Sequence, residues 1–345
     1  MRSEWLDNFT ISIGVDIGNI PFRNGTIPTS SPMSGIAILV FVITGVLGLV
    51  ALPLNGVIIF LVVTRKQLHQ EQYILLSSLA LADVVLIISQ TPVGMAATFI
   101  NKWPLGKVGC QITGFLCSFS IFASFINMAN IAIIRLICVV YTNLYRKLCR
   151  KKLTCITLIL VWLESVILAV PPFFGWGNYM FVRKFVLCTI DFSSSASYTA
   201  FCLILGGMIP QIIIVLCHII IFIKVKQSRR RIQNMKSSSN TTVPDLRLVF
   251  QLVIIILLFL ASYLPLFIFI VIDPKRKLPG VAYDIVKLFI TLKSVIQPLT
   301  FFYFNRLIRS ASGTLCSCLQ RKKHNKNIEG HPSASVQISS RKHDK

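Results

Sequence analysis

Acidic residues are scarce in this chain, and charged residues of both signs make up little of it. Only 12 of its 345 residues are Asp or Glu, 14% are charged and 54% are hydrophobic. The mean hydropathy is +0.73. Because a soluble domain carries about 25% charged residues, this composition excludes an ordinary soluble fold and indicates a membrane protein.

Motifs of metal, catalytic and transport sites are missing as well. The ten cysteines form no CxxC pair and no Cys/His cluster with metal-ligand spacing, so we expect no metal and no cofactor. Connections between the apolar runs are short and hold no nucleophile–base set, so we expect no enzyme. Neither half of the chain repeats the other, which argues against an inverted-repeat transporter. The N-terminus lacks a basic start followed by a short apolar core, so we expect no cleavable signal peptide.

The chain does contain long apolar runs. A run of about 20 apolar residues spans a bilayer as a helix, because lipid offers the backbone no hydrogen-bond partners. We therefore predict an all-α membrane protein in which residues 34–304 form a seven-transmembrane helix bundle. The seven runs lie at about 34–64, 72–99, 108–140, 153–173, 197–224, 247–272 and 282–304.

The positive charge is distributed by membrane side and not gathered in a nucleic-acid patch. Of the 35 Lys and Arg, 23 fall in the segments assigned to the cytoplasm and nine in the outer segments. An excess of Lys and Arg on the inner side sets membrane orientation, and it also attracts anionic inner-leaflet lipid. Sequons at Asn8 and Asn24 place residues 1–33 outside. We predict a plasma-membrane protein with a glycosylated extracellular N-terminus and a cytoplasmic C-terminus.

Two ionisable residues lie in the middle of apolar runs. A charge at mid-membrane costs ~2.5–3.5 kcal/mol unless it is paired or hydrated. Asp83 and Lys293 are one acid and one base, so we expect them to be partners in the bundle interior. Arg135 lies near the end of the third run, where an anchoring role and a functional role are equally supported by position alone.

Short motifs, in order and at matching spacing, resemble the rhodopsin-like (class A) G-protein-coupled receptors over residues 34–318. Arg135 falls twenty-five residues after Cys110, at the place of the family's signature arginine. Gln297-Pro298-Leu299-Thr300-Phe301 resembles the NPxxY motif, and Asn305 and Arg309 resemble the start of a short amphipathic eighth helix at 305–318. The other matching pieces are Leu54-Asn55-Gly56, Leu79-Ala80-Leu81-Ala82-Asp83, Trp103-Pro104-Leu105-Gly106, Trp162, Pro210 and Pro265.

Within that family the nearest members look melatonin-receptor-like and opsin-like. Phe174-Gly175-Trp176-Gly177 resembles an opsin outer loop, and Ala196-Ser197-Tyr198-Thr199 leading to Pro210 resembles a melatonin receptor. The resemblance implies a disulfide between Cys110 and Cys188, both in outer segments where disulfides persist. Cys316 and Cys318, in a basic stretch beyond the last span, are candidates for palmitoylation. The tail at 319–345 is basic and Ser-rich, and we expect it to be disordered.

The resemblance also implies a function. We expect a receptor that transduces an extracellular signal, through a small non-amine ligand, to heterotrimeric G protein, with arrestin and a receptor kinase as further partners. Alternatives are a receptor-shaped protein with impaired or constitutive signalling, a photoreceptor and a membrane transporter.

Several switch positions depart from the family pattern. Arg135 is flanked by Ile134 and Leu136 in place of an acid and a tyrosine. Asp245 is a candidate replacement for that acid, although after Pro244 it is equally suited to cap the next helix, and we slightly favour the cap. Tyr263 replaces a tryptophan, Gln297 replaces an asparagine, and Phe301 and His218 replace tyrosines.

Lys293 does not match the retinal lysine of opsins. The opsin position is Thr291 here, and two residues rotate a helix by ~200°. In the family the Lys293 face contributes to a sodium site, so we expect its ammonium to replace sodium beside Asp83. The alternative is a lysine that lines a hydrated cavity, and we favour the pair. The predicted polar core comprises Asn55, Asp83, Ser124, Lys293 and Ser294.

A ligand pocket is expected near the outer end of the bundle. Cys117 stands where amine receptors place an aspartate, so a monoamine is not expected. Lys287 is suited either to meet an anionic ligand or to extend to the surface, and we favour the surface. The candidate lining residues are Cys117, Ser118, Ile121, Cys202, Tyr263, Leu266, Phe267, Lys287 and Thr291.

Overall fold

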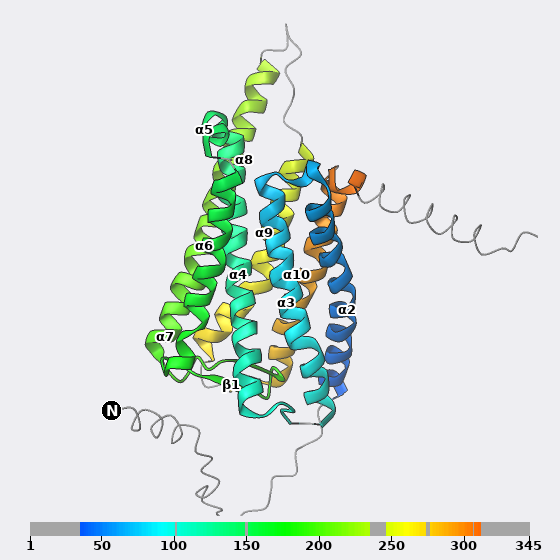
Figure 1. The fold of residues 1–345 in the computed structure, drawn as a ribbon, viewed down its shortest axis with the longest axis vertical. Coiled ribbons are helices and arrows are strands. Elements are labelled where there is room, and N and C mark those ends of the chain that lie inside the picture. Colours follow the sequence, from blue (N-terminus) through cyan, green and yellow to red (C-terminus); the bar gives the residue numbers. More distant parts are fainter. Residues whose placement is uncertain are drawn as a thin grey trace, which may run out of the picture. The chain divides into compact units, whose positions relative to one another are not determined.

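The computed structural model describes residues 35–100, 102–148, 151–234, 246–273, 277–305 and 307–311. Asn8, Asn24, Asp245, Cys316 and Cys318 lie outside these residues, as does the tail at 319–345. Within the described parts, seven long helical segments lie side by side as a bundle (Figure 1). They are α2 (Gly35–Thr64), α3 (Glu71–Ile100), α4 (Gly106–Val140), α6 (Lys151–Ala169), the composite α7 (Ala196–Phe201), η3 (Cys202–Met208) and α8 (Ile209–Asn234), α9 (Leu246–Ile272) and α10 (Gly280–Phe304).

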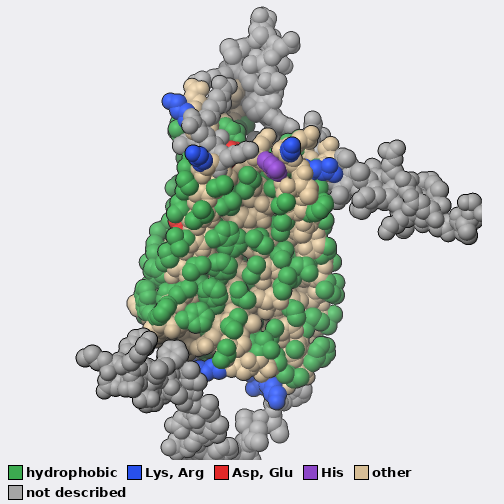
Figure 2. All heavy atoms as spheres, in the orientation of Figure 1, with side chains coloured by type: hydrophobic (Ala, Val, Ile, Leu, Met, Phe, Trp, Pro, Cys, Tyr) green, Lys and Arg blue, Asp and Glu red, His purple; other side chains and the backbone are tan. Residues whose placement is uncertain are grey.

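The outward face of these helices is apolar. Six of the segments are long and hydrophobic enough to cross a membrane, and the apolar stretch Leu257–Ile272 of α9 belongs to the seventh. Large side chains such as Leu49, Val63 and Ile159 are about two-thirds exposed on the outside of the bundle. In Figure 2 hydrophobic side chains cover the side of the bundle, and Lys and Arg lie at its two ends. The chain is therefore a multi-pass membrane protein, because only lipid makes such a surface stable.

Short elements connect the long helices. One end of the bundle, which the sequence predicts to be cytoplasmic and which is here called the inner end, carries η1 (Lys66–Leu68) and α5 (Thr142–Leu148). The opposite end, here called the outer end, carries η2 (Pro171–Phe174) and a two-stranded antiparallel hairpin. The strands β1 (Tyr179–Val182) and β2 (Leu187–Ile190) pair with Phe181 opposite Cys188. Of the predicted eighth helix at 305–318, Asn305 caps α10 and residues 307–311 are helical, whereas 306 and 312–318 lie outside the described residues.

Prolines modify two of the predicted spans. The fourth run was expected to continue to residue 173, but α6 ends at Ala169 because Pro171 and Pro172 open the η2 turn. In the fifth span, predicted at about 197–224, η3 is a π-helical turn that ends just before Pro210. Proline has no N–H to donate to the carbonyl four residues earlier, which favours such a local widening.

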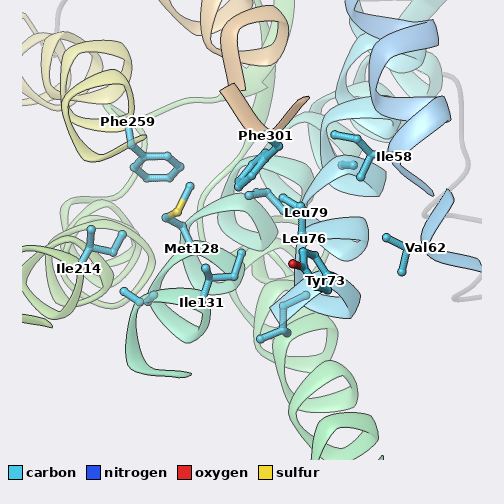
Figure 3. Close-up of a cluster of buried hydrophobic side chains, with 14 of the residues drawn as sticks. Ile58, Val62, Tyr73, Leu76, Leu79, Met128, Ile131, Ile214, Phe259 and Phe301 are labelled. Atoms are coloured by element: carbon cyan, nitrogen blue, oxygen red, sulfur yellow. The ribbon is translucent and has the colours of Figure 1, made fainter. Parts of the chain in front are cut away.

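The core surrounds α4, which contacts α3, α6, α8 and both strands. On its inner half, Met128 and Ile131 of α4 face Leu79 of α3, Phe259 of α9 and Phe301 of α10 (Figure 3). Phe301, at the NPxxY tyrosine position, is 1% exposed. Close packing of aromatic and branched aliphatic side chains from several helices thus joins the inner part of the bundle.

Candidate functional site

Asp83 of α3 and Lys293 of α10 form a buried ion pair at the centre of the bundle. Nζ of Lys293 lies 2.6 Å from Oδ1 of Asp83, and the two side chains are 1% and 0% exposed. Nε2 of Gln297 lies 3.4 Å from Oδ2 of the same carboxylate. The pairing expected from the sequence is present, and it lets two ionised groups lie in lipid-surrounded protein where either alone would be costly.

Asn55, another member of the predicted polar core, joins two helices. Nδ2 of Asn55 donates to the carbonyl oxygens of Ala51 and Ser294, at 2.9 and 3.0 Å, and so ties α2 to α10. Ser124 is fully buried, but among the described residues its hydroxyl has no hydrogen-bond partner. The ammonium of Lys293 instead lies 5.8 and 5.6 Å from the ring centres of Phe259 and Tyr263.

Tyr263 is not a lining residue of the outer pocket, contrary to the sequence prediction. It is fully buried beside the ion pair, with its ring 4.5 Å from that of Phe125 and 4.9 Å from that of Phe259. The sequence correctly placed Tyr263 on the inward face of α9, but it placed the residue too close to the outer end of the bundle. Phe125, one of the lining residues, packs directly against Tyr263 and so separates it from the cavity.

A cavity of about 190 Å³ lies in the outer half of the bundle, beneath the β1–β2 hairpin. Residues of α2, α3, α4, η3, α9, α10 and both strands line it, and most of them are apolar or aromatic. Eight of the nine predicted lining residues are among them: Cys117, Ser118, Ile121, Cys202, Leu266, Phe267, Lys287 and Thr291. Sequence reasoning missed the part contributed by α2, α3 and the hairpin, including Phe41, Gln90 and Thr189.

Lys287 faces this cavity and does not extend to the surface. Its side chain is 13% exposed, and its Nζ is buried, 4.1 Å from the centre of the Phe41 ring. The expectation of a surface-directed lysine is therefore wrong. α10 packs against α2 and α9, and the ammonium lies against the Phe41 ring of α2 instead of reaching the surface.

The hairpin is attached firmly over the cavity. The predicted disulfide is present, joining Cys110 at the start of α4 to Cys188 in β2. Tyr179 of β1 donates its hydroxyl to the carbonyl of Ala169 at 2.5 Å, and Tyr198 of α7 donates to Leu168 at 2.8 Å. These bonds satisfy the carbonyls left free where the prolines end α6.

A second set of contacts connects α9 to α10 near the mouth. The carboxylate of Asp273 accepts hydrogen bonds from the Tyr283 hydroxyl and from the amides of Lys277 and Leu278, at 2.6–2.7 Å. Lys184 of the hairpin turn donates to the Leu278 carbonyl. Burial by itself would raise the pKa of the Asp273 carboxyl, but these donors and the positive charge of Lys184 lower it overall.

The inner end carries the predicted switch residues. Arg135 is half-buried on α4, and its Nε has no hydrogen-bond partner among the described residues. Nδ1 of His218 lies 2.6 Å from the carbonyl oxygen of Ile214, so this contact is made within α8 and does not link two helices. Sequence reasoning missed Tyr73, whose hydroxyl accepts from Nδ2 of Asn305 at 3.0 Å and thereby ties α3 to the end of α10.

Prolines inside two helices coincide with predicted switch positions. Pro265 lies within α9, and Pro298 lies within α10. Each removes one backbone hydrogen bond from its helix, which makes that turn easier to bend.

A seven-helix membrane bundle with a disulfide-tethered outer hairpin, a cavity beneath it and a buried polar centre defines a receptor of the seven-transmembrane class. The family model described as 7 transmembrane receptor (rhodopsin family) matches residues 54–301, and the chain belongs to this family of G-protein-coupled receptors. Members of this family transduce signals to heterotrimeric G protein and are not enzymes, and the same holds for this chain.

The similar proteins include several melatonin receptors. The chain is 30% identical to melatonin receptor type 1C of Gallus gallus over 241 residues, covering 69% of this chain and 67% of that one. It is 30% identical to melatonin receptor type 1A-A of Danio rerio, covering 65% of each. The crystal structure of squid rhodopsin superposes with a TM-score of 0.70 at 23% identity, covering 87% of this chain and 93% of that one, which supports the shared fold.

Neither the photoreceptor nor the transporter alternative is supported. Thr291, at the opsin lysine position, lines the cavity, whereas Lys293 is not among the described residues that line it and is held by Asp83.

Proposed function

We propose that this receptor binds a small, largely apolar, non-amine ligand in the cavity beneath the β1–β2 hairpin. The observation that carries the proposal is the lining itself, which brings Cys117, Ile121, Phe267 and other mainly apolar side chains together around one space. Asp273 is the acid among the described lining residues, and its carboxylate already accepts three hydrogen bonds. A ligand amine therefore has no free carboxylate to pair with, and apolar contact supplies most of the affinity.

Coupling would occur at the other end of the bundle. With the N-terminus outside the plasma membrane, Arg135 and the basic inner connections face the cytoplasm, where they meet a G protein. Arrestin and a receptor kinase would act on the same face, and Cys316 and Cys318 would be lipid-anchored there. Ligand binding would shift the population towards a state in which that face opens.

Neutral aromatic compounds test the binding half of the proposal. Because the relatives are named as melatonin receptors, melatonin and naphthalene-2-carboxamide are the first probes. In lipid nanodiscs, each should raise the unfolding temperature of the wild type in a concentration-dependent way. Ile121→Trp, which fills the cavity, should remove that rise, and Ile112→Trp on the exposed side of α4 should keep it. No rise in the wild type, or an equal rise in Ile121→Trp, would contradict the proposal.

The coupling half needs a separate measurement. Nucleotide exchange on a panel of purified heterotrimeric G proteins should be accelerated by the receptor, and Arg135→Met should abolish the acceleration. Lys107→Met removes the same charge at the outer end of α4 and should leave exchange unchanged. Equal exchange with and without Arg135 would reject its role.

A second candidate is a receptor with impaired or constitutive signalling. The buried Asp83–Lys293 pair favours it, because a tethered ammonium holds the polar centre in one state whatever the ion content of the medium. Exchange in the absence of any ligand separates the two candidates: a high basal rate that the probes do not change supports the second.

A further inference from the structure

Lys287 places a positive charge inside the outer cavity with its hydrogen-bonding capacity unused. It lies on the face of α10 that also carries Ile290, Thr291 and Ser294, which line the same cavity at helical spacing. Lys287 is the one cation among the described residues that line the cavity. Its buried Nζ has no hydrogen-bond partner among the described residues.

The groups nearest to this ammonium attract it but do not accept a hydrogen bond from it. Oδ1 of Asp284 lies 4.0 Å away, one turn earlier on α10, which is beyond hydrogen-bond distance. The face of the Phe41 ring lies at 4.1 Å and contributes a cation–π contact. A lysine ammonium carries three donors, and a buried donor without an acceptor costs stability. The position is therefore unfavourable for the empty receptor and favourable once an anionic acceptor enters.

Other charged groups near the mouth are already engaged. The Asp273 carboxylate accepts three hydrogen bonds, and the Lys184 ammonium donates to the Leu278 carbonyl and lies over the Tyr283 ring. Asp284 is not among the described lining residues. The charge left available to a ligand is thus that of Lys287, which lies on α10 beside Phe41 of α2.

We propose that Lys287 forms a subsite for the carboxylate of an amphiphilic ligand, whose apolar body fills the part of the cavity between α4, η3 and α9. This rests on the proposed ligand cavity and adds the chemical class of the ligand: an aromatic or aliphatic carboxylic acid. The carboxylate accepts from the Lys287 ammonium in a charge-assisted hydrogen bond, which is strong because water is excluded. Phe267 and Ile121 contact the body.

Matched acid and amide probes test the subsite. Indole-3-acetate and naphthalene-2-carboxylate are compared with indole-3-acetamide and naphthalene-2-carboxamide, by thermal unfolding of the full chain in nanodiscs. The wild type should bind each acid about tenfold or more tightly than its amide. Lys287→Met should remove this preference and leave amide binding unchanged, whereas Lys287→Arg should keep it.

Asp284→Asn should change acid binding in the opposite direction to Lys287→Met. Removing the carboxylate that lies near Lys287 should strengthen acid binding and leave amide binding unchanged, which a merely structural role of α10 would not produce. Lys107→Met, with the same loss of charge at an exposed outer position, is the matched control and should bind all probes as the wild type does.

The outcomes separate the subsite from the cavity. Equal binding of acids and amides by the wild type, or an acid preference that survives in Lys287→Met, would overturn the subsite and leave the proposed cavity standing. Binding of neither series would overturn both. Loss of both series in Ile121→Trp, together with loss of the acid preference alone in Lys287→Met, would support both.

Discussion

Lys293 shows how a shift of two positions along a helix changes the chemistry of a side chain. At the opsin position, Thr291 faces the cavity, whereas the ammonium of Lys293 is 2.6 Å from Asp83 in the bundle centre. The pair is fully buried, so each charge is stabilised mainly by the opposite charge of its partner. Removing one partner of a buried pair costs about 3–5 kcal/mol, because the remaining charge is left uncompensated.

Lys293→Met should therefore lower the unfolding temperature and make the receptor sensitive to sodium. With the ammonium gone, Asp83 is free to bind a cation, so sodium chloride should stabilise this variant more than choline chloride does at equal ionic strength. The wild type should show no such difference.

The double variant Asp83→Asn/Lys293→Met is the control. It removes both charges, so it should recover most of the lost stability and respond equally to the two salts. A sodium response of the wild type as large as that of Lys293→Met would show that the ammonium does not occupy a cation position.

At the scale of elements, two glycines shape the turn between η2 and the hairpin. Gly175 and Gly177 have φ of +85° and +91°, which L side chains rarely adopt. A Cβ at Gly175 would meet nothing within 4 Å, but one at Gly177 would collide with the ring of Tyr198. Tyr198 is fully buried and holds the end of α6 through its hydroxyl, so it cannot move without losing that bond.

Gly175→Ala and Gly177→Ala should differ in their effect on stability. Each introduces a left-handed backbone penalty of about 1–2 kcal/mol. Gly177→Ala adds the displacement of Tyr198, for about 1–3 kcal/mol more. Thermal unfolding of the two variants measures the difference. Equal unfolding temperatures would show that Tyr198 is not held as tightly as its contacts indicate.

The connection from α9 to α10 depends on one ionised carboxylate. Because hydrogen bonds and Lys184 lower the pKa of Asp273 in the folded protein, its contribution to stability is fully present above the usual pKa of ~3.9. That contribution is lost as the pH falls through the lowered value. The connection should stay ordered at neutral and mildly acidic pH.

Hydrogen exchange at the amides of Lys277 and Leu278 measures this order, after correction for the intrinsic pH dependence of exchange. Protection should persist in the wild type from pH 7 to about pH 4 and fall below it. Asp273→Asn should reduce protection at every pH, and Asp191→Asn, in the segment after β2, should not. Protection in Asp273→Asn equal to that of the wild type would exclude the carboxylate as its source.

For the whole molecule, the distribution of Lys and Arg predicts the orientation in the membrane. With 23 of the 35 on the inner side, translocation of the first segment outward is favoured. In intact cells an N-terminal epitope tag should bind antibody, and a C-terminal tag should do so only after permeabilisation. The reverse pattern would place Arg135 outside and reject coupling through it.

The amino-acid sequence determined the number and order of the spans, the disulfide and the partnership of Asp83 with Lys293. The spans and the ion pair follow from local composition and from the cost of charge in lipid, whereas the disulfide follows from the resemblance to the receptor family. The end of α6 before Pro171 and the π turn before Pro210 were not predicted from the sequence. A proline can be accommodated by more than one change in the backbone, and its presence alone does not say which.

Only the tertiary structure decided the depth and direction of individual side chains. Tyr263 was expected in the pocket and Lys287 at the surface, and the packing of Phe125 against the first and of Phe41 against the second reversed both. A helix face predicts which residues point inward, but how far they lie from the cavity depends on neighbours tens or hundreds of residues away. Lys287 was therefore identified as a cavity-lining cation whose ammonium has no hydrogen-bond partner among the described residues only once the helices were packed together.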